Sequence, residues 1–160
     1  MKKILFVCHG NICRSPMAEF IMKKIAATAG VAAALHIESA ATSSEEIGNS
    51  VYPPAVRELA RHGISCEGKR ARRINAADFD FYDMVVVMED YNLRNLRALL
   101  VGDAREKVWK LLDFEGCSAA GNAERLEGGD ISDPWYHGNF SQTYAEIERG
   151  CKGLITYLGM

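Results

Sequence analysis

The 160-residue sequence contains no apolar run long enough to cross a membrane, no fixed-period repeat and no low-complexity tract. The apolar run Ile4–Cys8 ends at His9, far short of the ~20 residues that a membrane helix needs and too short for the core of a secretion signal. An excess of positive charge is also lacking, with 19 Lys and Arg, 21 Asp and Glu, and a net charge of −2. We therefore expect neither a membrane nor a nucleic acid as partner.

The cysteines do not form the pattern of a disulfide framework or of a metal site. Their number, 5, is odd, and a chain of this length buries roughly 70% of its unfolded surface, so it folds without such cross-links. Cys8 and Cys13 do not have a usual zinc-ligand spacing, and no second Cys/His pair is evident. These features predict a reduced, cytoplasmic protein with one reactive thiol and no bound metal.

What the sequence does contain is an alternation of short apolar segments and amphipathic segments. Strands are expected at residues 3–8, 36–40, 84–88 and 108–112, and helices at 15–29, 53–62, about 90–100 and about 141–158. Ser15 is the expected N-cap of the first helix, while Val56, Leu59 and Ala60 are the expected inward residues of the second. We therefore predict one α/β domain over residues 1–160, a three-layer sandwich with a four-stranded parallel sheet and helices on both faces.

The stretch from residue 113 to residue 138 breaks this alternation, because it holds several glycines and few apolar residues. Loops of this length are uncommon in compact domains, and those that occur are often functional. Within it, the segment Asp133–Tyr136 indicates by itself only a turn.

The junction between the first strand and the first helix has the composition of an anion-binding loop. Parallel sheets place ligand sites at the carboxyl ends of their strands, where Cys8 is expected. Loop N–H groups and the helix N-terminus together cradle a phosphate-sized anion, and the guanidinium of Arg14 matches two phosphate oxygens. Gly10 and Asn11 tolerate the positive φ that such a loop needs. We therefore predict a phosphate loop after the first strand.

The same surroundings favour a nucleophilic role for Cys8. A helix N-terminus and a nearby arginine stabilise a thiolate, and the Ser15 hydroxyl is placed to donate to the sulfur. The alternative is a buried cysteine at a strand end with an unrelated surface arginine, since Cys-x5-Arg alone is a weak signal. The strand before the loop and the helix after it favour the phosphate loop.

The loop Val7–Pro16 resembles the phosphate loop of the low molecular weight protein tyrosine phosphatases, and Asp133–Tyr136 resembles their general-acid loop. The resemblance extends over essentially the whole chain. It includes the further segments Ala40–Ser43, Arg61–Ile64, Ala71–Arg72 and Met88–Asn92.

The resemblance implies a metal-independent, cofactor-free phosphatase that acts on phosphotyrosine proteins and aryl phosphates. It assigns Cys8 as the nucleophile that forms a phosphocysteine intermediate, and Asp133 as the general acid and then the general base. Arg14 and the loop amides are implied to bind the phosphoryl oxygens. The remaining implied residues are the substrate-binding His9, Gly10, Asn11, Ile12, Cys13, Trp135 and Tyr136, and the loop-supporting Asn11, Ser15 and Ser43.

Three positions qualify the resemblance. His9 stands where the family commonly has an aliphatic residue, and Lys69 stands where many members have a loop-supporting histidine. Ile12 favours phosphotyrosine over phosphoarginine, because relatives that act on phosphoarginine tend to carry threonine there. The resemblance also raises a reversible Cys8–Cys13 disulfide, which the sequence leaves open.

Two other functions compete with the phosphatase. An arsenate reductase uses a similar loop but needs further relay cysteines, and residues 78–90 contain none. An inactive phosphate-binding module is disfavoured because Cys8, Arg14 and Asp133 are all present. The basic run Lys69–Arg73 is expected to be a solvated face, with a minor role in steering acidic phosphopeptides. We expect a monomer or a weakly self-associating protein.

Overall fold

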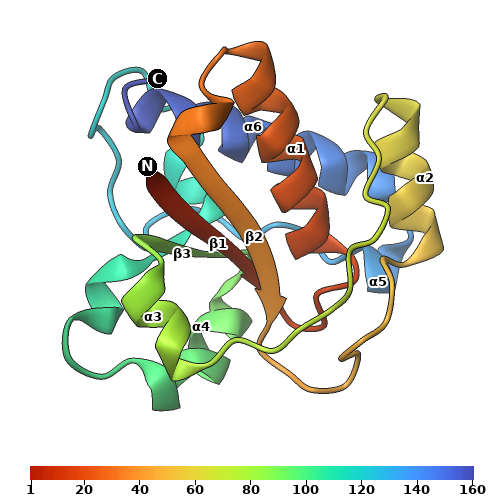
Figure 1. Ribbon diagram of the computed structural model, residues 1–160, viewed down its shortest axis with the longest axis horizontal. Coiled ribbons are helices and arrows are strands. Elements are labelled where there is room, and N and C mark those ends of the chain that lie inside the picture. Colours follow the sequence, from red (N-terminus) through yellow and green to blue (C-terminus); the bar gives the residue numbers. More distant parts are fainter.

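The computed structural model describes residues 1–160 as alternating strands and helices (Figure 1). The strands are β1 (Lys2–Cys8), β2 (Leu35–Ala41), β3 (Met84–Val87) and β4 (Val108–Lys110). The helices are α1 (Arg14–Thr28), α2 (Pro53–Arg61), α3 (Ala76–Phe81), α4 (Asp90–Leu96), α5 (Pro134–His137) and α6 (Phe140–Tyr157). Short 3-10 segments are η1 (Ala32–Ala34), η2 (Arg97–Leu99), η3 (Gly102–Lys107) and η4 (Leu111–Phe114).

The four strands form one parallel sheet in the order β2-β1-β3-β4, which confirms the predicted α/β fold. β1 lies inside the sheet, and its residues 4–8 are buried, as expected for a continuous apolar run between two helical layers. In register, Cys8 is paired with Ala41 at the end of β2. The carboxyl ends of β1 and β2 therefore lie together, at the edge where parallel sheets bind ligands.

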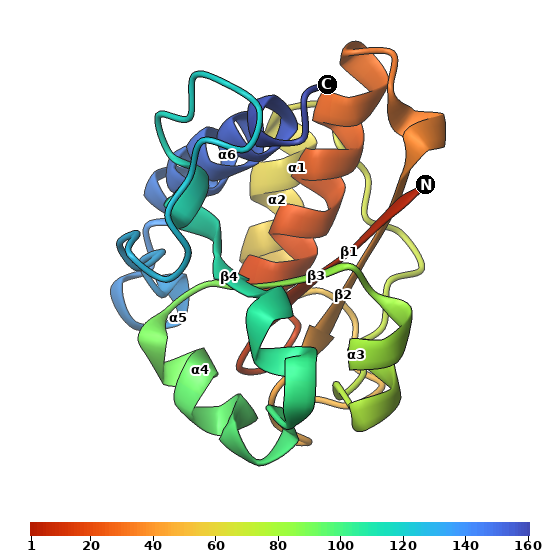
Figure 2. The ribbon, with the colours of Figure 1, turned by 90° about the vertical axis from the view of Figure 1, so that its left-hand side faces the viewer.

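Side chains alternate between the two faces of β1, and each face has its own core. Ile4 and Phe6 belong to the larger apolar cluster, together with buried residues of α1, α2 and α6. Leu5 and Val7 belong to a smaller cluster with residues of α3 and α4. Figures 1 and 2 show α1, α2 and α6 on one side of the sheet and α3 and α4 on the other. The three-layer arrangement is thus confirmed.

Two helix details differ from the sequence-based expectation. α1 begins at Arg14, so its N-cap is Cys13 rather than Ser15. The Ser15 hydroxyl instead forms hydrogen bonds with Cys8 and Asn11. In α2 the buried residues are Ala55, Glu58 and Leu59, whereas Val56 and Ala60 are exposed. The expected inward face of α2 was therefore wrong at two of its three positions.

The strand β4 and the helix α3 also depart from the expectation. β4 ends at Lys110, since residues 111–114 form the 3-10 segment η4. α3 was not predicted, and its six residues are too few to show a helical apolar period. A capping box between Asn75 and Asp78 begins it.

The long segment after β4 is held to the sheet at defined points. The carboxylate of Asp113 accepts backbone N–H bonds from Lys110, Leu126 and Gly128. Further along, the N–H of the buried Ile131 donates to the carbonyl of Met88 at the end of β3. This anchoring brings residues 131–136 to the carboxyl edge of the sheet.

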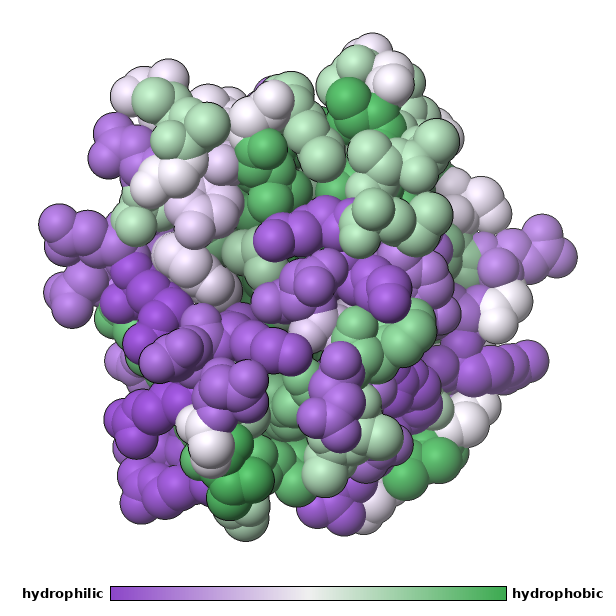
Figure 3. Space-filling view, turned by 60° about the vertical axis from the view of Figure 1, so that its left-hand side comes forward, coloured by the Kyte–Doolittle hydropathy of each residue, from purple (hydrophilic) through white to green (hydrophobic).

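The surface combines polar and apolar residues. On the face in Figure 3, hydrophilic side chains spread across the middle and left, with smaller hydrophobic patches between them. No helix of the structure combines the length and the hydropathy that a membrane crossing requires.

Candidate active site

The loop between β1 and α1 curls around the sulfur of Cys8. The backbone N–H of Ser15 donates to this sulfur at 3.4 Å, and the Ser15 hydroxyl oxygen lies 3.0 Å from it. Asn11 has a φ of 59°, in the left-handed region that asparagine tolerates better than most residues. A cavity of about 380 Å³ opens above Cys8, His9, Gly10, Ile12, Cys13 and Arg14.

A buried chain of hydrogen bonds supports the loop from behind. The side-chain amide of Asn11 donates to the hydroxyls of Ser15, at 2.7 Å, and Ser39, at 2.9 Å. The Ser39 hydroxyl donates to the buried Glu19 at 2.7 Å, and the ammonium group of Lys69 lies 3.0 Å from the same carboxylate oxygen. Because every member is satisfied, the chain fixes the conformation of the loop.

Arg14 is the buried cation of the site. Its Nη1 donates to Glu89 at 2.9 Å and to the carbonyl of Ile131 at 3.0 Å, while its Nη2 donates to Asp133 at 3.2 Å. Burial alone lowers the pKa of Arg14, but the hydrogen bond to Glu89 and the negative charges of Cys8, Asp133 and Glu89 outweigh it and raise that pKa. The guanidinium thus stays charged and is oriented toward the cavity.

Asp133 is the N-cap of α5 and lines the same cavity. Its Oδ1 accepts the N–H of Trp135, which is an N-cap hydrogen bond, and its Oδ2 accepts from Arg14. Trp135 and Tyr136 also line the cavity and remain 55% and 85% exposed. The ring centroids of Tyr52 and Trp135 are 5.0 Å apart. Two large aromatic side chains therefore border the entrance.

The structure brings together the residues that the sequence indicated, with one change, at Asn11. Ser43 contacts the loop outside the buried chain, because its hydroxyl donates to the carbonyl of the loop residue His9. Asn11 is only 1% exposed, so its side chain supports the loop and does not line the cavity. Cys8 is as close to Ser15 as the sequence analysis anticipated.

Sequence reasoning missed several residues of the site. Ser39 and Glu19 complete the buried chain, Glu89 orients Arg14, and Glu45, Glu46 and Tyr91 line the cavity. The available signal was the place of Ser39 near the end of β2, beside the carboxyl end of β1. Lys69, which stands where the resembled family has a histidine, supports the loop through Glu19 and the carbonyl of Ser39.

Three other cysteines, Cys13, Cys66 and Cys151, are poorly suited to nucleophilic chemistry. Burial first, and then the charges of Cys8 and Asp133, raise the pKa of Cys13. Burial also raises the pKa values of Cys66 and Cys151. Cys8 and Cys13 are the two cysteines that line the cavity, and all five cysteines are free.

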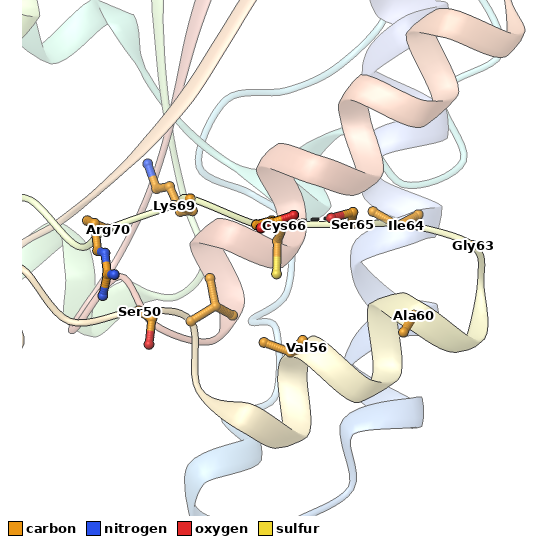
Figure 4. A pocket seen from close by; sticks show the side chains of 12 residues that line it. Ser50, Val56, Ala60, Gly63, Ile64, Ser65, Cys66, Lys69 and Arg70 are labelled. Carbon is orange, nitrogen blue, oxygen red and sulfur yellow. Dashed lines mark hydrogen bonds between the residues drawn. The ribbon is translucent and has the colours of Figure 1, made fainter.

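A larger cavity, of about 590 Å³, lies away from this chemistry, between α2 and residues 63–70 (Figure 4). Val56, Ala60 and Cys66 are among its lining residues. Val56 and Ala60 therefore face an open groove, which explains why they are not part of the core. The groove contains neither Cys8 nor Arg14, so it is not the candidate active site.

Comparisons with known proteins agree with this geometry. Residues 3–160 match the family described as low molecular weight phosphotyrosine protein phosphatase. The low molecular weight protein-tyrosine-phosphatase YfkJ of Bacillus subtilis is 35% identical over 155 residues, which cover 97% of this chain and 94% of that protein.

Solved structures have the same fold. The crystal structure of Bacillus subtilis YfkJ matches with a TM-score of 0.88 at 34% identity, over 99% of this chain and 95% of that one. Vibrio vulnificus Wzb in complex with benzylphosphonate matches with a TM-score of 0.78 at 25% identity, over 96% of each chain. A cysteine, an arginine and an aspartate that line one cavity are thus found on the fold of a known phosphatase. The chain belongs to the low molecular weight phosphotyrosine protein phosphatase family and is a protein tyrosine phosphatase.

Proposed function

We propose that Cys8 is the nucleophile of this phosphatase. The thiolate attacks the phosphorus of a phosphotyrosine, so that a sulfur–phosphorus bond forms while the bond to the phenolic oxygen breaks. The loop N–H groups and Arg14 bind the phosphoryl oxygens and stabilise their charge in the transition state. The carboxylic acid of Asp133 donates its proton to the departing phenolic oxygen.

The second step hydrolyses the phosphocysteine. Asp133, now a carboxylate, takes a proton from a water molecule as that water attacks phosphorus. The sulfur–phosphorus bond breaks, inorganic phosphate leaves, and Cys8 returns to the thiolate. The Ser15 hydroxyl stabilises the sulfur anion at the start and at the end of the cycle.

The walls of the cavity support an aromatic phosphate as substrate. Trp135 and Tyr136 offer aromatic surface at the entrance, and Ile12 contributes an apolar side chain to the lining. The related Wzb structure holds benzylphosphonate, a phosphonate on an aromatic group. We propose that this chain takes phosphotyrosine proteins in the same way and binds phosphate and other oxyanions in the loop.

The observation that carries the proposal is that Cys8, Arg14 and Asp133 line one cavity, with Arg14 donating to the Asp133 carboxylate at 3.2 Å. Hydrolysis of p-nitrophenyl phosphate, with a chelator present, tests it. We expect Cys8→Ser to remove turnover and Asp133→Asn to lower kcat by about 10²–10⁴-fold. Cys117→Ser, which changes a thiol outside the cavity, is the matched control.

Each alternative function predicts a different result of this assay. An inactive binding module would show no turnover in the unmodified protein. An arsenate reductase would consume thiols in the presence of arsenate, whereas the cavity here contains Cys8 and Cys13 and no further cysteine. Turnover that survives Cys8→Ser would exclude the phosphocysteine mechanism.

We also propose that residues 1–160 form one phosphatase domain that acts in the cytoplasm, without a metal or cofactor and without a nucleic acid partner. The net charge of −2 and the odd number of cysteines, none of which is paired in a disulfide, support this setting. Sedimentation of the purified protein tests the expected monomer or weak self-association.

A further inference from the structure

Two carboxylates stand at the entrance of the active-site cavity, on the segment that follows β2. Glu45 and Glu46 both line the cavity together with Cys8, Trp135 and Tyr136. The Glu45 side chain is 69% exposed, so its charge is available to a bound partner. The mechanism proposed above gives neither carboxylate a role.

His9 orients Glu45 without removing its charge. The Nε2 of His9 lies 3.1 Å from Oε2 of Glu45, and Nδ1 of His9 is buried without a hydrogen-bond partner. With a proton on Nε2, the imidazole donates to Glu45 and holds its carboxylate in place at the rim. His9, which stands where the family commonly has an aliphatic residue, thus holds the Glu45 carboxylate at the rim of the cavity.

Glu46 is also held by a neutral donor. The side-chain amide of Asn49 donates to Oε2 of Glu46 at 2.6 Å. The Cγ of Glu46 lies 3.4 Å from the position that a Cβ would occupy on Gly10, so its stem packs directly on the phosphate loop. Glu46 also raises the pKa of the loop residue Cys13 through its charge, as the last of several causes. Its charge therefore acts at the loop.

Positive charges near the cavity do not cancel this pair. Arg14 is the one cation among the lining residues, and it already pairs with Glu89 and Asp133. In the basic run 69–73, Lys69 pairs with Glu19 and Arg72 pairs with Asp78. Arg70 and Arg73 of the same run are exposed and do not line the cavity, and Arg94 lies over the ring of Tyr91 at 5.6 Å. Steering of acidic phosphopeptides by the basic run therefore stays a prediction, which the peptide comparison below also tests.

We propose that Glu45 and Glu46 select phosphotyrosine substrates that carry lysine or arginine beside the phosphotyrosine. This inference rests on the proposed function and names the class of its substrate. The phosphotyrosyl ring enters between the aromatic residues, and the neighbouring cationic side chain meets the two carboxylates at the rim. Since no lysine or arginine is paired with either carboxylate, a cationic neighbour of the phosphotyrosine is attracted to the rim and an acidic neighbour is repelled.

The experiment compares three phosphotyrosine peptides of one sequence, which differ only in whether the residues flanking phosphotyrosine are Lys, Gln or Glu. An exposed ion pair changes affinity by about two- to fivefold, so attraction and repulsion together predict a kcat/KM about tenfold higher for the Lys peptide than for the Glu peptide. The ratio should narrow at ~1 M salt, where the Debye length falls to about 3 Å. A chelator in every assay removes bridging by divalent cations.

Variants test whether the preference comes from Glu45 and Glu46. The ratio of kcat/KM for the Lys peptide to kcat/KM for the Glu peptide is measured within each variant, so that a general change in rate cancels. Glu45→Gln with Glu46→Gln should bring the ratio to within about twofold of unity, and Glu45→Lys should lower it below that of the unmodified protein. Glu67→Gln removes an exposed carboxylate at the other cavity and should leave the ratio unchanged.

The outcomes separate the inference from the proposed function. Absence of p-nitrophenyl phosphate hydrolysis would overturn the proposed function itself. Hydrolysis of p-nitrophenyl phosphate, which has no flanking residues, together with equal kcat/KM for the Lys and Glu peptides would leave the proposed function standing and overturn the charge selection. A Lys preference that persists in the double variant would also overturn it, because the two carboxylates would then not be its source.

Discussion

The hydroxyl oxygen of Ser15 lies 3.0 Å from the sulfur of Cys8 and at the same time accepts a hydrogen bond from Asn11 at 2.7 Å. A serine hydroxyl has a single proton. While Cys8 is a thiol, its S–H donates to the Ser15 oxygen, and the Ser15 hydroxyl donates to the carbonyl of Ala40 at 3.4 Å. A sulfur anion can only accept, so the Ser15 proton turns to the sulfur when Cys8 is deprotonated, and the charged acceptor receives the stronger bond.

Replacement of Ser15 by alanine tests this relationship. We expect Ser15→Ala to slow both kcat and the alkylation of Cys8 by iodoacetate at neutral pH by about 10–100-fold, since a hydrogen bond to a charged group contributes about 1.5–3 kcal/mol. Ser43→Ala is the control, because the Ser43 hydroxyl bonds to the carbonyl of His9 and does not reach the sulfur. Equal losses in the two variants would contradict the assignment.

Asn11 combines two roles that substitution separates. Asn11→Gly removes the side-chain amide, and glycine adopts the left-handed backbone with a φ of 59° without strain. Asn11→Ala removes the amide as well, but alanine is strained at this φ. We expect both variants to bind phosphate more weakly, and Asn11→Ala to be about 1 kcal/mol less stable than Asn11→Gly because of its strain at positive φ. Isothermal titration with phosphate and urea unfolding measure the two effects. If Asn11→Gly bound phosphate as well as the unmodified protein, the amide would have no supporting role.

The thiols should differ in reactivity in the folded protein. Burial raises the pKa values of Cys13, Cys66 and Cys151, so these side chains remain protonated at neutral pH, and a protonated thiol is a poor nucleophile. Alkylation near pH 7 is therefore expected at Cys8, and at the half-exposed Cys117. Peptide mass mapping identifies the modified sites, and vanadate should protect Cys8 and leave Cys117 unprotected. Rapid labelling of Cys13 at pH 7 would contradict the burial effect.

Close packing of α6 on η4 depends on two glycines. A Cβ at Gly153 would lie 1.7 Å from the carbonyl oxygen of Phe114, a backbone atom, whereas a Cβ at Gly150 would first meet the side chain of Leu111 at 2.6 Å. Gly153→Ala should lower the free energy of unfolding by about 2–3 kcal/mol or more, despite the ~1 kcal/mol that alanine gains over glycine in a helix. Gly150→Ala should cost less, because a side chain moves more easily than backbone. Urea unfolding of both variants checks the order.

Local sequence determined the strands, the helices that are long enough to show a period, and the phosphate loop. Cys8, Gly10, Asn11 and Arg14 lie within one short segment between β1 and α1, so their types and spacing were sufficient to predict an anion site. Helix α3 escaped prediction because six residues show no period. The N-cap of α1 was misplaced because the Ser15 hydroxyl was expected in two roles, as a cap and as a partner of the Cys8 sulfur, and in the folded protein it takes the second one.

The order in which the strands pair in the parallel sheet determines which distant residues complete the site. Asn11 reaches Ser39 because β2 pairs with β1, and Arg14 reaches Asp133, 119 residues away in the chain, because Ile131 binds the end of β3. The contact between His9 and Glu45 also depends on the pairing of β1 with β2, because His9 follows β1 and Glu45 lies on the segment after β2. Residue types and short spacings record which groups lie near one another along the chain, whereas contacts between distant segments depend on strand order and register, which exist only in the folded protein.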